Sequence, residues 1–530
     1  MCLAQITLLF VSYYGGACFS LPAGLGSPAH TIPADTGTHT GKLKHAPPDQ
    51  VLDSGYSFER RPSVRHITMN EIVTYSATRQ ARLIRERRVS SLELVTAHLE
   101  RIAAINPKLN AAVEVLAESA LAAAAAADAS EPRGPLHGVP FSVKDSFEVV
   151  GTVVTAGTLG RKNAAASTED AALVARLIRA GAIPIAKTNL PDLLFAFESD
   201  NLIFGATRNP YDIARTPGGS SGGEAALIAA CGSPLGLGSD CAGSVRLPAA
   251  FCGCAAIKPT SGRLPRTGHF PPAGGWIEAL WQIGPMARRV EDLITVMPLL
   301  IGPDGRDHTV VDMPLSSPRH VSVPDLRFAF YTDNGLAAAD AEVSGVVRAA
   351  AAALAEKGVS VEEARPDCLA AAYEIEMKLI GADGGDSLRS YLRDIGSTSV
   401  HPLLTGWLDK LEQYRTGIDG FARYWGEWFR YRAEMAAFLA GGYDAILCPA
   451  YIHPALPLGT STLDENFIGF SHTMAYNVAG WPAAVVRCGE SSTGLPIAVQ
   501  IAAAPWREDI VLAVALSLEQ AFGGWKPPAE

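Results

Sequence analysis

From residue 68 onward, the positions of the apolar residues follow the periods of helices and strands. Ser90 followed by Glu93 fits a capping box at the start of a helix. After this start, apolar residues recur at steps of three and four and form one face of an amphipathic helix: Leu92, Val95, Leu99 and Ile102. We expect Asn106 and Pro107 to end this helix, because proline disfavours the helical conformation of the residue before it. A second, alanine-rich helix is predicted over residues 111–127.

The following segments alternate between strand and helix patterns. Residues 139–143 form a short apolar strand that leads directly into Lys144 and Asp145. Further strands are predicted over 183–186, 235–238, 443–450, 483–487 and 497–501. Helices are predicted over 168–180, 224–230 and 507–522, with a helical turn over 245–251. This alternation predicts an α/β fold with a substantially parallel sheet, and the late strands are expected to complete the same sheet in one large domain.

Residues 340–440 are predicted to be mainly helical, and aromatic residues gather in the second half of this region. Two interpretations are open for these aromatic side chains, a lid or pocket wall and the packing core between helices. The residues are Trp407, Tyr414, Phe421, Tyr424, Trp425, Trp428, Phe429 and Tyr431.

The first 68 residues lack this patterning. Residues 8–14 form a short apolar run that resembles the core of a signal peptide, but no Lys or Arg precedes it. The run is too short to span a bilayer. We therefore predict an N-terminal extension over 1–68 and a domain over 69–530. We expect a cytoplasmic protein, with export by a weak N-terminal signal left open.

Composition narrows the function classes. The 530 residues are 48% apolar and 18% charged, which is typical of a globular protein with a large core. The net charge of −10 argues against binding to nucleic acid and to anionic membranes. Nine cysteines without framework spacing do not indicate a disulfide scaffold. Cys252 and Cys254 have no second Cys or His cluster nearby, so we expect buried thiols and no metal.

The most informative stretch lies between Thr216 and Arg246. It contains the sequence PGGSSGGEAA around Ser220 and Ser221, followed by GLGSDCAGSVR, which ends at Arg246. Glycines let the backbone approach a substrate closely. The second sequence reads as a strand, a tight turn and a helix start, which exposes a serine hydroxyl beside free backbone N–H groups. Such groups stabilise an oxyanion by about 3–4 kcal/mol per donor.

Two other functions of this glycine-rich stretch are disfavoured. A phosphate-binding loop requires the Gly-Lys-Ser/Thr or Gly-x-Gly-x-x-Gly pattern, and neither is present. The stretch also matches the Gly-x-Ser-x-Gly elbow of α/β-hydrolases, for which Asp464 and His472 follow in the required order. That elbow needs a hydrophobic strand directly before it, whereas residues 209–217 read as a loop.

Together with further motifs, this stretch resembles the amidase signature family. The other matching segments lie at 134–145 (GPLHGVPFSVKD), 186–189 (AKTN), 204–210 (FGATRNP), 253–259 (GCAAIKP) and 284–288 (GPMAR). The similarity extends from about residue 69 to the C-terminus and is greatest to the bacterial amidase and fatty-acid-amide-hydrolase-like branches. The resemblance implies a single large α/β domain with a mixed β-sheet flanked by helices. It also implies a helical pocket or lid region over about 340–440.

The resemblance implies a catalytic triad. Lys144 is similar to the catalytic lysine, Ser220 to the bridging serine that follows a cis peptide bond, and Ser244 to the nucleophile. The turn that supplies oxyanion N–H groups corresponds to Cys241, Ala242, Gly243 and Ser244. Positions that support these groups correspond to Ser221, Ser239, Asp240 and Arg246. A pocket-wall segment corresponds to Leu194, Phe195 and Phe197, whose apolar character favours a hydrophobic acyl or aryl group, with plain core as the alternative.

The chemistry of these residue types agrees with the roles. A serine hydroxyl needs a base before it attacks a carbonyl. Burial lowers the pKa of a lysine, and Lys144 follows a strand that we expect to be buried. His137 lies inside a motif but is expected to shape the loop. In the family, two glycines precede the nucleophile, and here the first is Ala242. Its N–H is retained, while its methyl group narrows the site or requires a negative φ.

We therefore predict an amidohydrolase that acts through an acyl-enzyme, with ester and carbamate cleavage left open. No metal or organic cofactor is implied. The expected partner is a small-molecule amide, hydrophobic in character, without nucleic acid or stable membrane insertion, and a homodimer is left open. One alternative is the glutamine-hydrolysing subunit of a tRNA-dependent amidotransferase, which requires partner chains. The other is a non-catalytic binding protein on the same scaffold.

Overall fold

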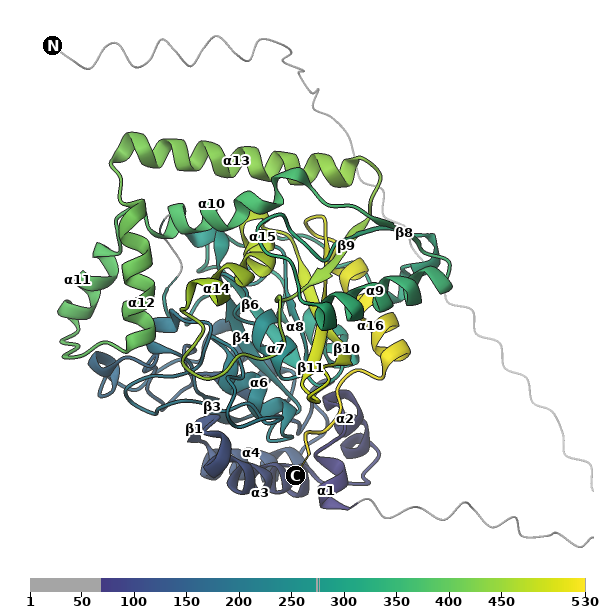
Figure 1. The fold of residues 1–530 in the computed structure, drawn as a ribbon. Helices are drawn as coiled ribbons and strands as arrows, with labels where there is room; N and C mark the ends of the chain where they lie inside the picture. The colour runs from purple at the N-terminus through teal and green to yellow at the C-terminus, as the bar shows by residue number, and fades with distance from the viewer. Residues whose placement is uncertain (1–67, 273–274, 276, 530) are drawn as a thin grey trace, which may run out of the picture. The chain divides into compact units, whose positions relative to one another are not determined.

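A mixed β-sheet forms the centre of the computed structural model, which describes residues 68–272, 275 and 277–529. Within these residues, eleven strands are ordered β1-β3-β2-β4-β6-β5-β10-β11-β9-β7-β8 (Figure 1). Their bounds are β1 Ala112–Val115, β2 Pro140–Lys144, β3 Ile183–Thr188, β4 Leu235–Asp240, β5 Ala255–Lys258, β6 Gln282–Ala287, β7 Arg327–Phe330, β8 Ser360–Glu363, β9 Ala445–Pro449, β10 Ala483–Glu490 and β11 Pro496–Ala503.

The sheet is parallel only in two places. Strands β3, β2 and β4 are parallel to one another, as are β9, β7 and β8, and the pairs between and beside them are antiparallel. Parallel neighbours need a crossover helix, whereas antiparallel neighbours can be joined by a short turn. The predicted α/β class and the mixed sheet are confirmed, but a substantially parallel sheet is wrong for the central strands β6, β5, β10 and β11, which are antiparallel to their neighbours.

Helices flank this sheet. Their bounds are α1 Met69–Ile72, α2 Ala77–Arg85, α3 Ser91–Leu109, α4 Ala117–Asp128, α5 Ala172–Arg179, α6 Gly222–Ala229, α7 Arg246–Phe251, α8 Val290–Leu300, α9 Ala341–Glu356, α10 Ala371–Ile380, α11 Asp386–Asp394, α12 Pro402–Leu411, α13 Ile418–Ala440, α14 Asp464–Phe467, α15 Ser471–Ala479 and α16 Glu508–Phe522. Single 3-10 turns lie at Leu159–Arg161, Asp192–Leu194, Glu278–Leu280, Pro318–His320, Val323–Asp325, Asp367–Ala370, Glu412–Tyr414 and Ile468–Phe470. The mainly helical character of residues 340–440 is confirmed by α9 to α13.

In the described part of the chain the buried apolar residues form three clusters. One large cluster includes residues of α8 and α16, which pack on β5, β6, β10 and β11. A second includes residues of α10, α12, α13 and α15. In this second cluster α10 packs against α13 and α15, and α12 packs against the turn Asp192–Leu194 (Figure 1). Burying a leucine or phenylalanine side chain completely contributes about 1.5–3 kcal/mol, so this helical layer has its own apolar core.

The first predicted helix is confirmed at its start and is longer than expected at its end. Ser90 Oγ accepts the Glu93 N–H at 3.0 Å, and Glu93 Oε2 accepts the Ser90 N–H at 2.8 Å. Pro107 lies inside the helix, which ends at Leu109, and Asn110 follows with φ 51°. The termination that we expected before Pro107 is therefore wrong.

The segment 111–127 is not one helix. Its first residues form β1, an edge strand that pairs antiparallel with β3, and α4 follows. A backbone partner in β3 thus outweighs the helix propensity of alanine.

The buried face of α3 differs from the predicted one. Leu92 is exposed and Leu94 is buried instead, so the buried face is rotated around the helix axis relative to the prediction.

The N-terminal predictions fall on residues 1–67, outside the described part of the chain. The division between residues 68 and 69 therefore stays a prediction. Across residues 68–529, apart from the gaps given above, no helix combines the length and apolar character needed to cross a bilayer.

Candidate active site

The three residues predicted as the triad lie on separate segments near the carboxyl ends of two parallel strands. Lys144 is the last residue of β2, Ser220 lies in the loop before α6, and Ser244 lies in the turn between β4 and α7. Strands β2 and β4 are parallel neighbours, so their carboxyl ends reach the same edge of the sheet. Lys144 and Ser220 are completely buried, and 6% of Ser244 is exposed. Lys144 and Ser220 are therefore in direct contact, and the backbone of Ser244 lies beside the loop that carries Ser220.

Direct hydrogen bonds join two members of this group. Lys144 Nζ donates to Ser220 Oγ at 2.7 Å and to Ser239 Oγ at 3.1 Å. The Gly219–Ser220 peptide bond is cis, which is the isomer that the resemblance implies. Among the described residues, the Ser244 hydroxyl has no hydrogen-bond partner. Its segment is held instead by the backbone, because the Ser221 N–H donates to the Ser244 carbonyl at 3.1 Å.

The surroundings of Lys144 favour its neutral form. Burial lowers the pKa of Lys144 from its ordinary 10.5 to about 7, although the nearby Asp240 and Glu224 act in the opposite direction. A lysine with this pKa exists in large part as a free amine at neutral pH. Lys144 can therefore accept a proton, which an ordinary surface lysine cannot.

A buried carboxylate organises the turn that carries Ser244. Asp240 Oδ1 accepts the Gly243 N–H at 2.8 Å, and Oδ2 accepts the Val245 N–H at 3.1 Å. The Arg246 guanidinium pairs with the same carboxylate at 2.9 Å. Burial raises the pKa of Asp240, but the charge and hydrogen bonds of Arg246 outweigh this effect and hold the pKa well below its usual range. Asp240 is therefore ionised and fixes the shape of the turn.

This arrangement alters the expected set of oxyanion donors. The Gly243 N–H is already donated to Asp240, so in this arrangement it is not available to an oxyanion. In the described part of the chain, the N–H groups of Cys241, Ala242 and Ser244 donate no hydrogen bond to the protein. Three of the four expected donors are thus unoccupied.

Ala242 and Gly243 differ in how far the turn restricts them. The φ of Ala242 is not positive, so its methyl group causes no backbone strain. Gly243 has φ +124°, and a Cβ at this position would lie 2.2 Å from Thr473 Oγ1. Only the second position of this turn therefore requires glycine.

The predicted pocket residues lie beside Ser244, the predicted nucleophile. Leu194, Phe195 and Phe197 line a cavity that Ser244 also lines. Other residues complete its wall: Ala196, Cys241, Ala242, Trp281, Ile380 and Trp407. Of the eight aromatic residues noted in the sequence, Trp407 is the one that the structure places in this wall. Its neighbours Tyr414, Trp428 and Tyr431 belong to the buried core of the helical layer.

Sequence reasoning missed a buried carboxyl next to the lysine. Glu224 is completely buried on α6 and accepts hydrogen bonds from Ser142 Oγ and, at 2.7 Å, from Thr188 Oγ1. Burial raises the pKa of Glu224 to about 8. Ser142 lies two residues before Lys144 on β2, on the same side of the strand, so Glu224 supports the strand end that carries the lysine. A glutamate inside the glycine-rich motif was the available signal.

The alternative chemistries have no matching geometry. Asp464 is exposed and pairs with Lys410, while His472 is buried and its Nε2 bonds to the Ala337 carbonyl at 2.9 Å. These two residues therefore do not form the Asp–His pair of an α/β-hydrolase. Cys252 and Cys254 are buried free thiols that contact backbone carbonyls.

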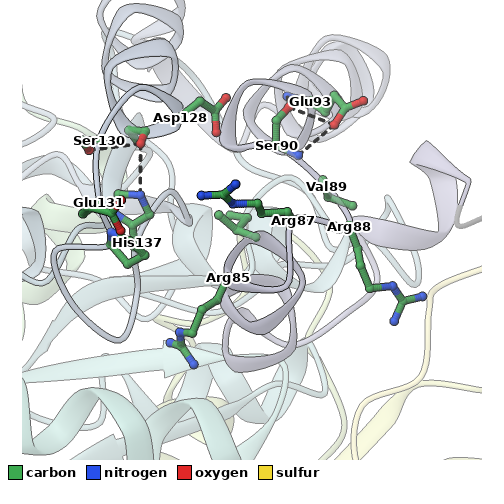
Figure 2. A pocket seen from close by; sticks show the side chains of 13 residues that line it. Arg85, Arg87, Arg88, Val89, Ser90, Glu93, Asp128, Ser130, Glu131 and His137 are labelled. Atoms are coloured by element: carbon green, nitrogen blue, oxygen red, sulfur yellow. Dashed lines mark hydrogen bonds between the residues drawn. The ribbon is translucent and has the colours of Figure 1, made fainter.

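A larger groove, of about 710 Å³, is lined by different residues at the ends of α2 and α4 and the start of α3. Figure 2 shows Arg85, Arg87 and Arg88 on one side of it, with Asp128 and Glu131 on the other. Asp128 already accepts the first N–H groups of α3, at 2.6 and 2.9 Å. The groove contains none of the residues of the serine site, and its charges are mixed.

The chain is similar to several known proteins over most of its length. The sequence profile of the family described as Amidase matches residues 93–512. The chain is 33% identical to fatty-acid amide hydrolase 2-A of Danio rerio over 500 residues, which cover 87% of this chain and 91% of that protein. It is 32% identical to a glutamyl-tRNA(Gln) amidotransferase subunit of Syntrophobacter fumaroxidans, over 83% of this chain and 95% of that protein. A structure of 6-aminohexanoate cyclic dimer hydrolase complexed with substrate is similar with a TM-score of 0.76 and 28% identity, over 85% of this chain and 97% of that one.

Proposed function

The chain belongs to the Amidase family of amide-hydrolysing enzymes, and on this premise we propose that it cleaves a small-molecule carboxamide through a serine acyl-enzyme. Ser244 is the nucleophile, Ser220 passes the proton, and Lys144 is the final base. The observation that carries this proposal is the buried Lys144 amine, 2.7 Å from Ser220 Oγ, with a pKa lowered to about 7.

In the first half of the reaction, Ser244 Oγ attacks the carbonyl carbon of the substrate. Its proton moves to Ser220 Oγ, while Ser220 gives its own proton to Lys144. Negative charge develops on the carbonyl oxygen, and the unoccupied N–H groups of the 241–244 turn stabilise it. The C–N bond then breaks as Lys144 returns the proton through Ser220 to the leaving amine.

In the second half, water replaces the serine as the nucleophile. Water attacks the ester carbonyl carbon while the same relay carries its proton to Lys144. The ester bond then breaks as Lys144 returns the proton through Ser220 to Ser244 Oγ, and the acid is released. Hydrogen bonds of this kind often tighten only when substrate is bound. We therefore expect the Ser244 hydroxyl to turn toward Ser220 Oγ in the complex.

The wall of the cavity supports a hydrophobic acyl or aryl group on the substrate. Leu194, Phe195 and Phe197 are apolar and lie beside Ser244. Linear amides are the preferred proposal, while esters and carbamates require the same carbonyl chemistry. A cytoplasmic enzyme and a homodimer stay predictions that fractionation and light scattering would test.

A hydrolysis screen of aliphatic amides, anilides, carbamates and glutamine tests the proposed reaction. The wild type should release amine and become labelled by a fluorophosphonate at Ser244. The variants Ser244→Ala and Lys144→Ala should lose both properties while keeping the wild-type unfolding temperature. Hydrolysis and labelling that persist in Ser244→Ala would show that another residue is the nucleophile. A folded wild type that neither hydrolyses nor is labelled would favour the non-catalytic binding protein.

A second candidate is the glutamine-hydrolysing subunit of a tRNA-dependent amidotransferase. The identity of 32% to the amidotransferase protein of Syntrophobacter fumaroxidans, over 95% of its length, favours this candidate. The apolar cavity beside Ser244 disfavours it, because glutamine is polar at its α-carbon end. Release of ammonia from glutamine, together with co-purification of partner chains, would establish the second candidate over the first.

A further inference from the structure

A buried carboxyl on α10 has no hydrogen-bond partner. Glu376 is completely buried, and in the described residues neither of its carboxyl oxygens is hydrogen-bonded. Burying a polar group without a partner costs about 1–3 kcal/mol in proteins. Buried polar groups in native structures are nearly always paired, so the exception calls for a physical reason.

Glu376 lies next to the wall of the serine cavity. Ile380 follows it by one helical turn on the same face of α10, and Ile380 lines the cavity together with Ser244. Cys241 lines the same cavity. Burial is the main cause that raises the pKa of the Cys241 thiol, and a negative charge on Glu376 would raise it further, which indicates that the two side chains are near each other. The carboxyl is therefore close to the cavity wall on the side of the oxyanion turn.

Two further unpaired groups belong to the same cavity. Trp281 and Trp407 both line it, and the indole Nε1 of each is buried without a hydrogen-bond partner among the described residues. An indole N–H is only a donor. The cavity wall thus combines apolar surface with two unpaired N–H donors and has an unpaired carboxyl close by.

The protonation of Glu376 determines what it can bind. Burial raises the pKa of this carboxyl far above its usual range, the nearby Asp240 raises it further, and Arg246 lowers it. The Tyr431 hydroxyl on α13 is already donated to the Ala475 carbonyl. Glu376 is therefore a neutral carboxylic acid, which donates one hydrogen bond and accepts others.

On the basis of the amide hydrolysis proposed above, we propose that the substrates carry a second, neutral hydrogen-bonding group in the acyl part. This group is a hydroxyl or a carbonyl oxygen, and Glu376 and the indoles of Trp281 and Trp407 bind it. A plain hydrocarbon chain would leave all three groups unpaired. A site built to bind a substrate hydroxyl rejects the analogue without it strongly, because the polar groups of the protein are then left without partners. The cavity therefore selects a functionalised acyl group over a simple fatty acyl chain.

Substrate preference tests this inference. The p-nitroanilides of octanoic acid, of hydroxyoctanoic acids with the hydroxyl on each carbon beyond the fourth, and of an amino-octanoic acid would be compared by kcat/KM. At least one hydroxylated substrate should be preferred over octanoyl anilide by about tenfold or more. Glu376→Leu should reduce this ratio toward one, and Glu376→Gln, which keeps a donor and an acceptor, should retain most of it.

The ratio of two substrates on one variant does not depend on how much of the variant is folded. Trp281→Phe and Trp407→Phe remove the indole N–H together with part of the ring, and they should also lower the ratio. Trp425→Phe is the matched control, since Trp425 Nε1 is likewise unpaired but does not line the cavity. An unchanged ratio in Glu376→Leu, or an equal loss in Trp425→Phe, would overturn the inference.

Two further outcomes are distinguished by the same experiment. Preference for the amino-octanoyl substrate, lost in Glu376→Gln, would show a carboxylate that binds ammonium and would overturn the neutral group proposed here. Absence of hydrolysis of every anilide by the wild type would contradict the proposed function. Calorimetry would then measure the affinities of the Ser244→Ala variant for octanamide and for hydroxyoctanamides. Tighter binding of a hydroxyoctanamide would support the second hydrogen-bonding group on the substrate, and equal affinities would overturn the inference.

Discussion

Lys144 Nζ lies 2.7 Å from Ser220 Oγ, and both side chains are completely shielded from solvent. This pair unites the proposed base and the proposed proton relay away from water, where the amine is easier to keep uncharged. Burial, more than any charged neighbour, sets the pKa of the lysine.

The first prediction concerns this lysine and pH. In the wild type, kcat/KM should fall as the pH decreases through about 7, because Lys144 becomes protonated and can no longer accept a proton. Lys144→Ala should lose about 10²–10⁴-fold in kcat/KM, which is the usual contribution of a general base. Hydrolysis of an anilide from pH 5 to pH 9 measures both effects. The exposed Lys162→Ala is the control, and a flat profile in the wild type would contradict the prediction.

The second prediction concerns Glu224. Its folded-state pKa is raised from 4.5 to about 8, so its contribution to stability is full below pH 4.5 and is lost as the pH rises through 8. Glu224→Gln stays neutral at all these pH values and accepts one of the two hydroxyl hydrogen bonds. The unfolding temperature of the variant should therefore rise relative to that of the wild type between pH 5 and pH 9. A difference in unfolding temperature between the variant and the wild type that stays constant with pH would contradict the raised pKa of Glu224.

The third prediction concerns the oxyanion turn. Gly243→Ala should abolish labelling by a fluorophosphonate and lower the unfolding temperature, since the new Cβ would lie 2.2 Å from Thr473 Oγ1 at a φ of +124°. Ala242→Gly serves as the matched change at the neighbouring position. It should keep kcat/KM within about threefold, because the N–H donor is unchanged and the backbone angle is already relaxed. Equal effects of the two substitutions would contradict this account of the turn.

The fourth prediction concerns the buried ion pair of Asp240 and Arg246. Arg246→Met should lower the free energy of unfolding by about 3–5 kcal/mol, because it leaves a buried carboxylate without its partner. Arg348→Met is the control, since Arg348 and Glu363 form an exposed pair, and little change is expected. Denaturant titration of both variants measures the difference. A similar small effect in both would mean that the backbone N–H groups and Asn477 Nδ2, which donates to Asp240 Oδ1 at 2.9 Å, satisfy Asp240 without Arg246.

Much of the site was predictable because its residues lie in short, local motifs. The capping box at Ser90, the strand that ends in Lys144, and the strand–turn–helix around Ser244 all follow from neighbouring residues. Strand pairing was less predictable. Strands β6 and β8 were missed because their sequences carry weak strand patterns, with Gly284 and Pro285 inside β6 and three polar residues in the four of β8. Strands β5 and β7 were also missed, and each has only four residues.

The sequence alone determined the identity of the lysine and the two serines, the α/β class, and the apolar residues near position 195. The tertiary structure decided which of these groups act together. It buried Lys144 and so set its pKa, and it gave the Gly243 N–H to Asp240. It also placed Trp407 in a cavity beside Ser244, with Glu376 one helical turn from the lining residue Ile380. The burial of Lys144 and the position of Trp407 depend on solvent exclusion and on contacts between segments far apart in the sequence, and neither is encoded in any local pattern.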